Sequence, residues 1–427
     1  MLFFSGFCQF EDYPASCAYG TYRGPFGVGT MLAKIPTLVF YPEQYKSSPG
    51  GCIDGHVKHA NPPLGKYDMP LWFNTTLARD YVYNTAVKSK DGYRFWDTYG
   101  FMHSDHPEEQ DDVFIRDWKY IVRHKPASMK RSPIFFAEFP REESIYEAEF
   151  ATRSNWHVYY NPSEEGIAHI YECMRSSGLP MGSYAVWDAL DTLTAEDTDL
   201  LVLPSTTSLS PERIAKIRKL YSEGVSLMAV GRVDGLEDLF GVRYAPHRES
   251  YTAIDDGKLC ESIYPYTDSF NYAPDGAEAI LCASGNPVLM RHGRTAILNV
   301  AAYSIGRIHF NDHPYLGRTT NSELFKRTTD AVLASLVQPT AVADSGVGIT
   351  HLTDSSGNDI LVLIDYSNHD GSKIGVEHEY TVRLNCDYSR AEAIDNKPLR
   401  QLSSDGRLDA IAVTLRQHES ALIKLIK

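Results

Sequence analysis

Apolar residues in the middle of the chain, between about residues 132 and 337, form short unbroken runs separated by segments with helical spacing. Unbroken runs of this length are typical of buried strands in a parallel sheet. They predict strands at residues 133–139, 183–187, 199–204 and 226–230. Strands and helices that alternate along a chain indicate an α/β fold, in which helices cover both faces of a parallel sheet.

The helices between these strands have recognisable ends. Ser163 is a predicted N-cap, and the helix that follows it ends before Gly178. A second helix begins after Ser210 with Pro211 at its first position, and Gly224 ends it.

Helical spacing disappears from about residue 340 onward, and short strands replace it. Asp405-Gly406 is a predicted hairpin turn between two of them. The predicted strands cover residues 358–366, 379–385, 391–394, 410–415 and 420–426. Several short strands in fewer than about a hundred residues favour a small antiparallel β-sandwich.

The first 126 residues are rich in loops and aromatic side chains. Two short strands, at 36–41 and 68–74, and a helix at 77–87 make up β/α units there. A chain of 427 residues favours two or three folded units. We predict three, over residues 1–126, 130–338 and 340–427.

Charge and composition narrow the range of partners. Lys and Arg number 41 against 55 Asp and Glu, which gives a net charge of −14. Nucleic acid is therefore not an expected partner, because a phosphate-backbone binder needs excess cations. No segment has the roughly 18 consecutive apolar residues of a membrane span, so no membrane partner is expected either.

The seven cysteines are scattered and form no C-x-x-C pair, which favours a reducing cytoplasmic location over a disulfide framework. Histidines occur in three close pairs, and none has an evident third ligand of the kind a zinc site requires. We therefore expect no metal and no other cofactor. The pairs are His56 with His59, His103 with His106, and His309 with His313.

The strand at 226–230 leads into a predicted sharp strand-to-helix turn over residues 230–236. In many α/β hydrolases and transferases such a turn presents a nucleophile beside helix N–H groups that stabilise an oxyanion. Here the residue at the turn is Arg232, which stays protonated and offers no lone pair for attack. The sequence predicts the architecture of a nucleophile elbow without its chemistry.

Together these segments resemble two accessory domains of glycoside hydrolase family 42 β-galactosidases. Residues 199–204, 211–222, 223–231 and 236–242 resemble the trimerisation domain of that family. The resemblance implies a class I glutamine amidotransferase-like, flavodoxin-like fold without amidotransferase activity, and a homotrimer. Residues 391–395 through 418–423 resemble the small C-terminal β-sandwich of the same enzymes.

The family places a catalytic (β/α)8 barrel before these domains, and a whole barrel needs about 200 residues or more. The resemblance therefore implies only a partial barrel in residues 1–126. Glu43 would then stand at the carboxyl end of a late barrel strand as a catalytic carboxylate, and Glu11 is the candidate second carboxylate, with Asp12 beside it. The aromatic residues expected to hold a sugar are Tyr41, Trp72, Phe73 and Trp96.

Three functions remain open at this point. The first is a carbohydrate-active protein of glycoside hydrolase type, represented mainly by its accessory domains. The second is a non-catalytic sugar-binding or oligomerisation protein with a degenerate amidotransferase-like domain. The third is an active amidotransferase or hydrolase with an unrecognised nucleophile, which the lack of Cys at position 232 disfavours.

Overall fold

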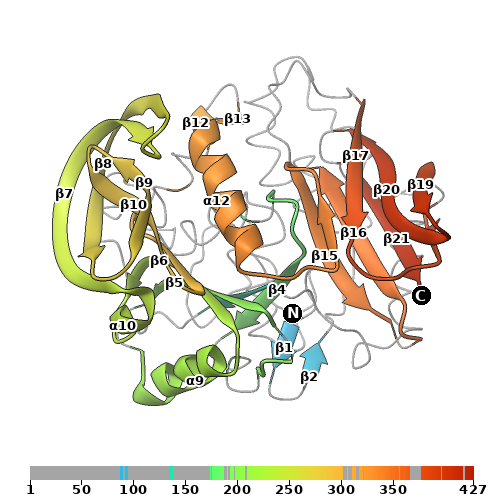
Figure 1. The fold of residues 1–427 in the computed structure, drawn as a ribbon, viewed down its shortest axis with the longest axis horizontal. Helices are drawn as coiled ribbons and strands as arrows, with labels where there is room; N and C mark the ends of the chain where they lie inside the picture. The colour runs from blue at the N-terminus through green and yellow to red at the C-terminus, as the bar shows by residue number, and fades with distance from the viewer. Residues whose placement is uncertain are drawn as a thin grey trace, which may run out of the picture.

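The computed structural model describes the large central sheet and the C-terminal sheets (Figure 1). In that view the helix α12 (Glu323–Ser335) lies between the two parts. The described residues are 87–89, 92–94, 134–138, 174, 176–186, 190, 193–196, 198–206, 209–301, 305, 310–313, 317–320, 322–354, 356–365, 377–395, 397–416 and 419–427.

One half of the large sheet is parallel, as the sequence predicts for an α/β fold. Its strands lie in the order β4-β3-β5-β6-β11, and each pairs in parallel with its neighbour. Numbered along the chain, this is the order 2-1-3-4-5, one of the two common arrangements of doubly wound sheets. The strands are β3 (Ile134–Glu138), β4 (Met181–Val186), β5 (Leu200–Thr206), β6 (Ser226–Val233) and β11 (Thr295–Leu298).

The other half of the sheet is antiparallel, which the sequence analysis did not predict. The strands β7 to β10 lie in the order β10-β9-β7-β8 and extend the sheet beyond β11. The expected strand-helix alternation up to residue 337 is therefore wrong over residues 242–292. The strands are β7 (Val242–Asp255), β8 (Cys260–Pro274), β9 (Glu278–Ala283) and β10 (Asn286–His292).

The predicted helix after Ser210 is confirmed as α9 (Pro211–Ser222). The Ser210 side chain accepts a hydrogen bond from the backbone N–H of Arg213, and Pro211 occupies the first helical position. Gly224 follows the helix with φ at +113°, a conformation that favours glycine. The predicted helix after Ser163 lies outside the described residues, apart from position 174, which is helical.

The helix α12, which the sequence analysis did not single out, is capped by a carboxylate from β8. Glu261 accepts the Ser322 hydroxyl at 2.7 Å and the backbone N–H groups of Glu323 and Leu324 at 3.1 and 2.8 Å. A negative charge at a helix N-terminus also interacts favourably with the helix dipole. This cap joins α12 to the antiparallel half of the sheet.

The C-terminal strands form two four-stranded antiparallel sheets, which confirms the predicted sandwich. Asp405 and Gly406 have φ angles of +49° and +79° and connect two paired strands, as predicted for a hairpin turn. One sheet contains β14 (Ala341–Ala343), β17 (Glu377–Leu384), β20 (Arg407–Arg416) and β19 (Leu399–Ser404) in that order. The other contains β15 (Val347–Thr353), β16 (Asp359–Asp365), β21 (Ser420–Ile426) and β18 (Arg390–Ala393).

The strand β16 packs against a core on each of its faces. Ile360, Val362 and Ile364 belong to the apolar cluster of the large sheet. The alternate residues Leu361 and Leu363 belong to the interior of the sandwich. Side chains alternate along a strand, so the two faces of β16 pack against different cores and every residue of β16 is buried. The sheet that contains β16 therefore joins the sandwich to the α/β part.

Two further strand pairs are short: β1 (Val87–Ser89) with β2 (Gly92–Arg94), and β12 (Phe310–His313) with β13 (Gly317–Thr320). Among the residues that the structure describes, none belongs to a helix long and apolar enough to cross a bilayer.

Gly178 lies in the segment before β4, where the backbone contacts the sandwich strands β14 and β15. Its N–H donates to the Val347 carbonyl at 3.1 Å, and its own carbonyl accepts from the Ala343 N–H at 2.8 Å. The φ angle of Gly178 is +80°, and a Cβ atom there would lie 2.2 Å from the Ala343 carbonyl oxygen. This close backbone approach requires glycine.

We expect Gly178→Ala to lower the free energy of unfolding by about 2–4 kcal/mol, because it adds a backbone clash to the cost of a left-handed conformation. The matched control is Gly357→Ala, which has the same φ of +80° and nothing within 4 Å of the added Cβ. The control should lose only about 1–2 kcal/mol. Chemical denaturation measures both, and equal losses would contradict the close packing at Gly178.

Candidate functional site

Most of the residues that the sequence singles out lie outside the described part of the chain. These are Glu43, Glu11, Tyr41, Trp72, Phe73 and Trp96, together with Asp12 and the histidines 56, 59, 103, 106 and 309. The predicted roles of these carboxylates and aromatic residues therefore remain predictions. Arg232 is among the described residues, and its neighbours form a candidate site with it.

Arg232 lies within β6 instead of at the apex of a turn. Gly231 has φ at +74°, and the pairing of β6 with β5 shifts register between Pro204 and Thr206. The irregularity allows β6 to continue to Val233, so the turn falls later, at Asp234-Gly235, where Gly235 has φ at +84°. A short helix, α10 (Glu237–Phe240), follows this turn.

The guanidinium of Arg232 forms a two-point ion pair with Asp234. Its Nε donates to Asp234 Oδ1 at 2.9 Å, and its Nη2 donates to Asp234 Oδ2. Burial opposes the charge of Arg232, but the contact with Asp234 outweighs it and raises the pKa of the guanidinium above its ordinary value. Arg232 is therefore a permanent cation fixed by its neighbour.

Two tyrosines from the antiparallel half of the sheet complete this group. The buried Tyr272 hydroxyl donates to Asp234 Oδ1 at 3.1 Å and accepts the backbone N–H of Val233 at 2.9 Å. Tyr244 packs edge-to-face on Tyr272, and the Arg232 guanidinium lies 5.1 Å from the centre of the Tyr244 ring. We call these four residues, Arg232, Asp234, Tyr244 and Tyr272, the β6-end cluster.

The β6-end cluster can bind polar groups, but it contains no cysteine or serine of the kind that a nucleophile elbow presents. Burial first, and then the neighbouring Asp234, raises the pKa of Tyr272, so that its hydroxyl stays protonated at neutral pH. The Asp234 carboxylate is held by an arginine and a tyrosine. The geometry is that of a pre-organised hydrogen-bonding group at the carboxyl end of a parallel strand, where open α/β sheets bind ligands.

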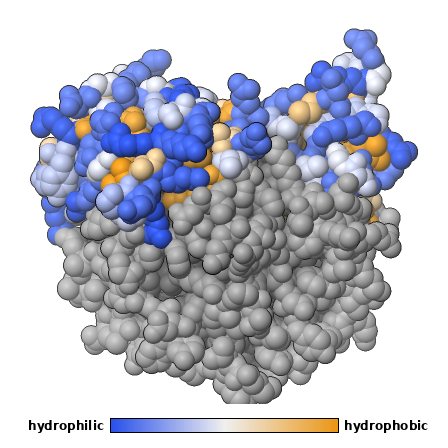
Figure 2. All heavy atoms as spheres, turned by 90° about the horizontal axis from the view of Figure 1, so that it is seen from below, coloured by the Kyte–Doolittle hydropathy of each residue, from blue (hydrophilic) through white to orange (hydrophobic). Residues whose placement is uncertain are grey.

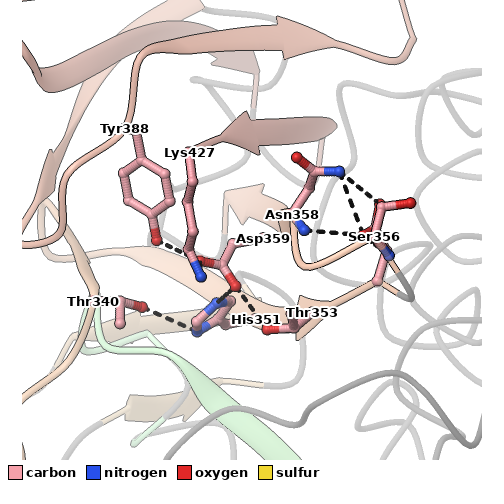
Figure 3. Close-up of polar contacts among 9 residues, drawn as sticks. Thr340, His351, Thr353, Ser356, Asn358, Asp359, Tyr388 and Lys427 are labelled. Atoms are coloured by element: carbon pink, nitrogen blue, oxygen red, sulfur yellow. Dashed lines mark hydrogen bonds and ion pairs between the residues drawn. The ribbon is translucent and has the colours of Figure 1, made fainter.

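A second polar group lies in the sandwich and was not predicted from the sequence (Figure 3). The buried Asp359 carboxylate accepts the Thr353 hydroxyl at 2.6 Å and the Tyr388 hydroxyl at 2.6 Å. Its Oδ1 lies 3.1 Å from His351 Nε2, and its Oδ2 lies 3.4 Å from Lys427 Nζ. We call this group the Asp359 cluster.

The contacts of the Asp359 cluster explain its electrostatics. Burial opposes ionisation of Asp359, but the contacts with His351, Thr353 and Tyr388 outweigh it and hold the pKa of the carboxyl well below its usual range. Burial and the nearby carboxylate raise the pKa of Tyr388. The cluster connects β15, β16 and the segment before β18 inside the sandwich, which indicates a structural role.

Figure 3 also shows how the turn between β15 and β16 is closed. The buried Asp354 carboxylate accepts the backbone N–H groups of Ser356 and Asn358 at 2.8 and 2.9 Å. Aspartate commonly stabilises turns in this way. Within the described ranges no group of three or more His, Cys, Asp or Glu side chains could hold a metal ion.

Comparisons with known proteins find relatives only by structure. No family model matches the chain, and no curated protein matches its sequence. A β-galactosidase from Rahnella sp. R3 matches 93% of this chain and 62% of its own, with 11% identity and a TM-score of 0.50. An α-L-fucosidase isoenzyme 2 from Paenibacillus thiaminolyticus matches 85% and 58%, with 12% identity and a TM-score of 0.51. The chain shares their fold.

A catalytic mutant of Gan42B, a family 42 β-galactosidase from G. stearothermophilus, matches 84% of this chain with 10% identity and a TM-score of 0.46. The chain spans between 51% and 62% of the length of these three structures. The fold shared with the β-galactosidase and the α-L-fucosidase, at 11% and 12% identity, supports a distant structural relationship to these glycoside hydrolases.

Proposed function

We propose that this protein is carbohydrate-active and of glycoside hydrolase type, and that the described domains are its accessory part. The observation that carries the proposal is the fold shared with a β-galactosidase over 93% of the chain. The sandwich and the large sheet belong to that shared fold. The wealth of aromatic residues, 12% of the chain, suits a protein that stacks sugars on flat rings.

The large sheet is proposed to be an amidotransferase-like domain that lost its chemistry and serves self-association. Its parallel half has a doubly wound strand order, and Arg232 stands near the end of β6 where an active enzyme would need a nucleophile. The ion pair with Asp234 keeps that arginine charged. By resemblance to family 42 we propose a homotrimer.

Bond cleavage, in this proposal, belongs to residues 1–126. Glu43 would be one of the two carboxylates that glycoside hydrolysis requires, and Glu11 would be the other. If the carboxyl groups stand about 5 Å apart, one attacks the anomeric carbon while the other protonates the leaving oxygen; if about 6.5–9.5 Å apart, a water attacks instead. Tyr41, Trp72, Phe73 and Trp96 would line the sugar site.

A second candidate is a non-catalytic sugar-binding or oligomerisation protein. It is favoured by one observation: the residue at the candidate elbow is an arginine, which cannot act as a nucleophile and is held in an ion pair with Asp234. Only the first candidate predicts turnover of a glycoside.

The test is an assay of the purified chain against a panel of nitrophenyl glycosides that includes β-galactosides and α-fucosides. The first candidate predicts release of nitrophenol from at least one glycoside. Absence of turnover with every glycoside would leave only the binding protein. Sedimentation of the same sample should show a trimer, and a strictly monomeric species would contradict the proposed self-association.

A further inference from the structure

Three strands bring the β6-end cluster together from distant parts of the sequence. Arg232 and Asp234 come from the end of β6, whereas Tyr244 on β7 and Tyr272 on β8 are direct partners in the antiparallel hairpin. The cluster thus lies where the parallel strand β6 ends beside the β7–β8 hairpin.

The Asp234 carboxylate is fixed in place but can still accept a hydrogen bond. Its Oδ1 accepts from Arg232 and Tyr272, and its Oδ2 accepts from Arg232. A carboxylate has about four lone-pair positions, so Oδ2 can take another donor. The Asp234 side chain is 29% exposed, which leaves it accessible to a ligand hydroxyl.

Tyr244 supplies an aromatic surface beside Arg232, the partner of that carboxylate. It is 52% exposed, and among the large hydrophobic residues that the structure describes only Leu259 is comparably open. In the view of Figure 2 the described surface is mostly hydrophilic, with hydrophobic residues gathered in patches. The Arg232 guanidinium over the Tyr244 ring holds the ring in position, because a cation is attracted to an aromatic face.

We propose that the β6-end cluster is a binding site for a neutral sugar ring. The C–H groups of the ring would pack on Tyr244, and a neighbouring hydroxyl would donate to Asp234 Oδ2. A neutral sugar is favoured over an anionic one because Glu237 places a second carboxylate at the same turn, where its Oε2 accepts the Gly235 N–H. Repulsion between like charges then disfavours a sugar acid.

This inference rests on the proposed carbohydrate function and assigns a sugar site to residues 232–272. The site belongs to the accessory part, so it would hold a substrate or product chain without breaking a bond.

The test is a titration of the full chain, labelled with 3-fluorotyrosine, with methyl β-D-galactopyranoside. The resonance that is missing in Tyr244→Phe identifies Tyr244, and we expect added sugar to shift it in a saturable way. Asp234→Asn should raise the half-saturating sugar concentration about tenfold or more, since a hydrogen bond to a charged acceptor is lost. Galacturonate should bind more weakly than the neutral glycoside.

The control variant is Leu259→Ala, which changes the other exposed hydrophobic residue at the opposite end of the β7–β8 hairpin and should leave the titration unchanged. Thermal denaturation of Asp234→Asn checks that the cluster still folds. An unshifted Tyr244 resonance at saturating sugar, or an unchanged titration in a folded Asp234→Asn, would overturn the proposal. Because the readout is local to Tyr244, it is separate from nitrophenyl glycoside turnover, which tests the proposed function.

Discussion

The Glu43→Gln variant is expected to lose turnover of nitrophenyl glycosides by about 10²–10⁴-fold. Glutamine keeps the size of the side chain but has no negative charge, so it neither attacks the anomeric carbon nor stabilises the positive charge that develops there. Initial rates over a range of substrate concentrations measure the effect. We expect kcat to fall far more than KM changes, because the lost interaction acts mainly in the transition state.

The control for charge removal is Glu249→Gln, an exposed position on β7. It should keep the rate of the unchanged protein. Glu11→Gln should reduce the rate as well, since it is the candidate second carboxylate. A folded Glu43→Gln protein with full activity would rule out Glu43 as a catalytic residue.

Asp359→Asn is expected to have the largest effect on stability, a loss of about 3–5 kcal/mol. The substitution removes the charge that His351 and Lys427 contact, and it places an amide among hydroxyls that donate to a carboxylate. Buried polar groups that lose their partners carry the full cost of desolvation. Urea denaturation of the variant and the unchanged protein measures the difference.

The effect of Asp359→Asn should depend on pH with a definite sign. The pKa of Asp359 is lower in the folded protein than the ordinary value of about 3.9 in the unfolded chain. Its ionisation therefore stabilises the fold fully above about pH 5, and the contribution is lost as pH falls through the folded pKa. The stability difference between the two proteins should shrink as pH falls below about 4.

The matched control is Asp387→Asn, whose side chain is 87% exposed and pairs with Arg407 at the surface. Surface pairs of this kind contribute about 0–1 kcal/mol. A stability difference for Asp359→Asn as small as that of the control would show that the buried carboxylate does not stabilise the sandwich.

The elements that sequence analysis predicted best are those with a strong local pattern. The helix after Ser210 carries a serine cap, a proline at its first position and a terminal glycine, and the structure has all three. The parallel strands β5 and β6 contain unbroken apolar runs, at residues 200–203 and 227–230. The turn at Asp405-Gly406 follows from residue types that accept positive φ angles.

The β7–β8 hairpin escaped prediction because most of β7 faces solvent. Its 14 residues include few buried positions, so neither an apolar run nor a clear alternation marks it. A signal was present in the turns: Asp256-Gly257 and Asp275-Gly276 are typical hairpin pairs, and both glycines have positive φ angles. Read together, they would have indicated antiparallel strands in this region.

The two polar clusters depend on contacts between residues far apart in the sequence. Asp234 and Tyr272 are 38 positions apart, and Asp359 and Tyr388 are 29 positions apart. No sequence motif corresponds to either spacing, because the side chains are brought together by strand pairing. Arg232 was predicted at the turn after the strand but lies within β6. The cause is local, because the irregularity at Gly231 allows β6 to continue past the expected turn.

The central claim is that the chain is a carbohydrate-active relative of glycoside hydrolases whose catalytic carboxylates lie in residues 1–126. A crystal structure of the full chain soaked with methyl β-D-galactopyranoside tests it most directly. We predict a sugar beside Glu43 with a second carboxylate facing it, either about 5 Å or about 6.5–9.5 Å away. A Glu43 with no facing carboxylate, in crystals that hold no sugar anywhere on the chain, would contradict it.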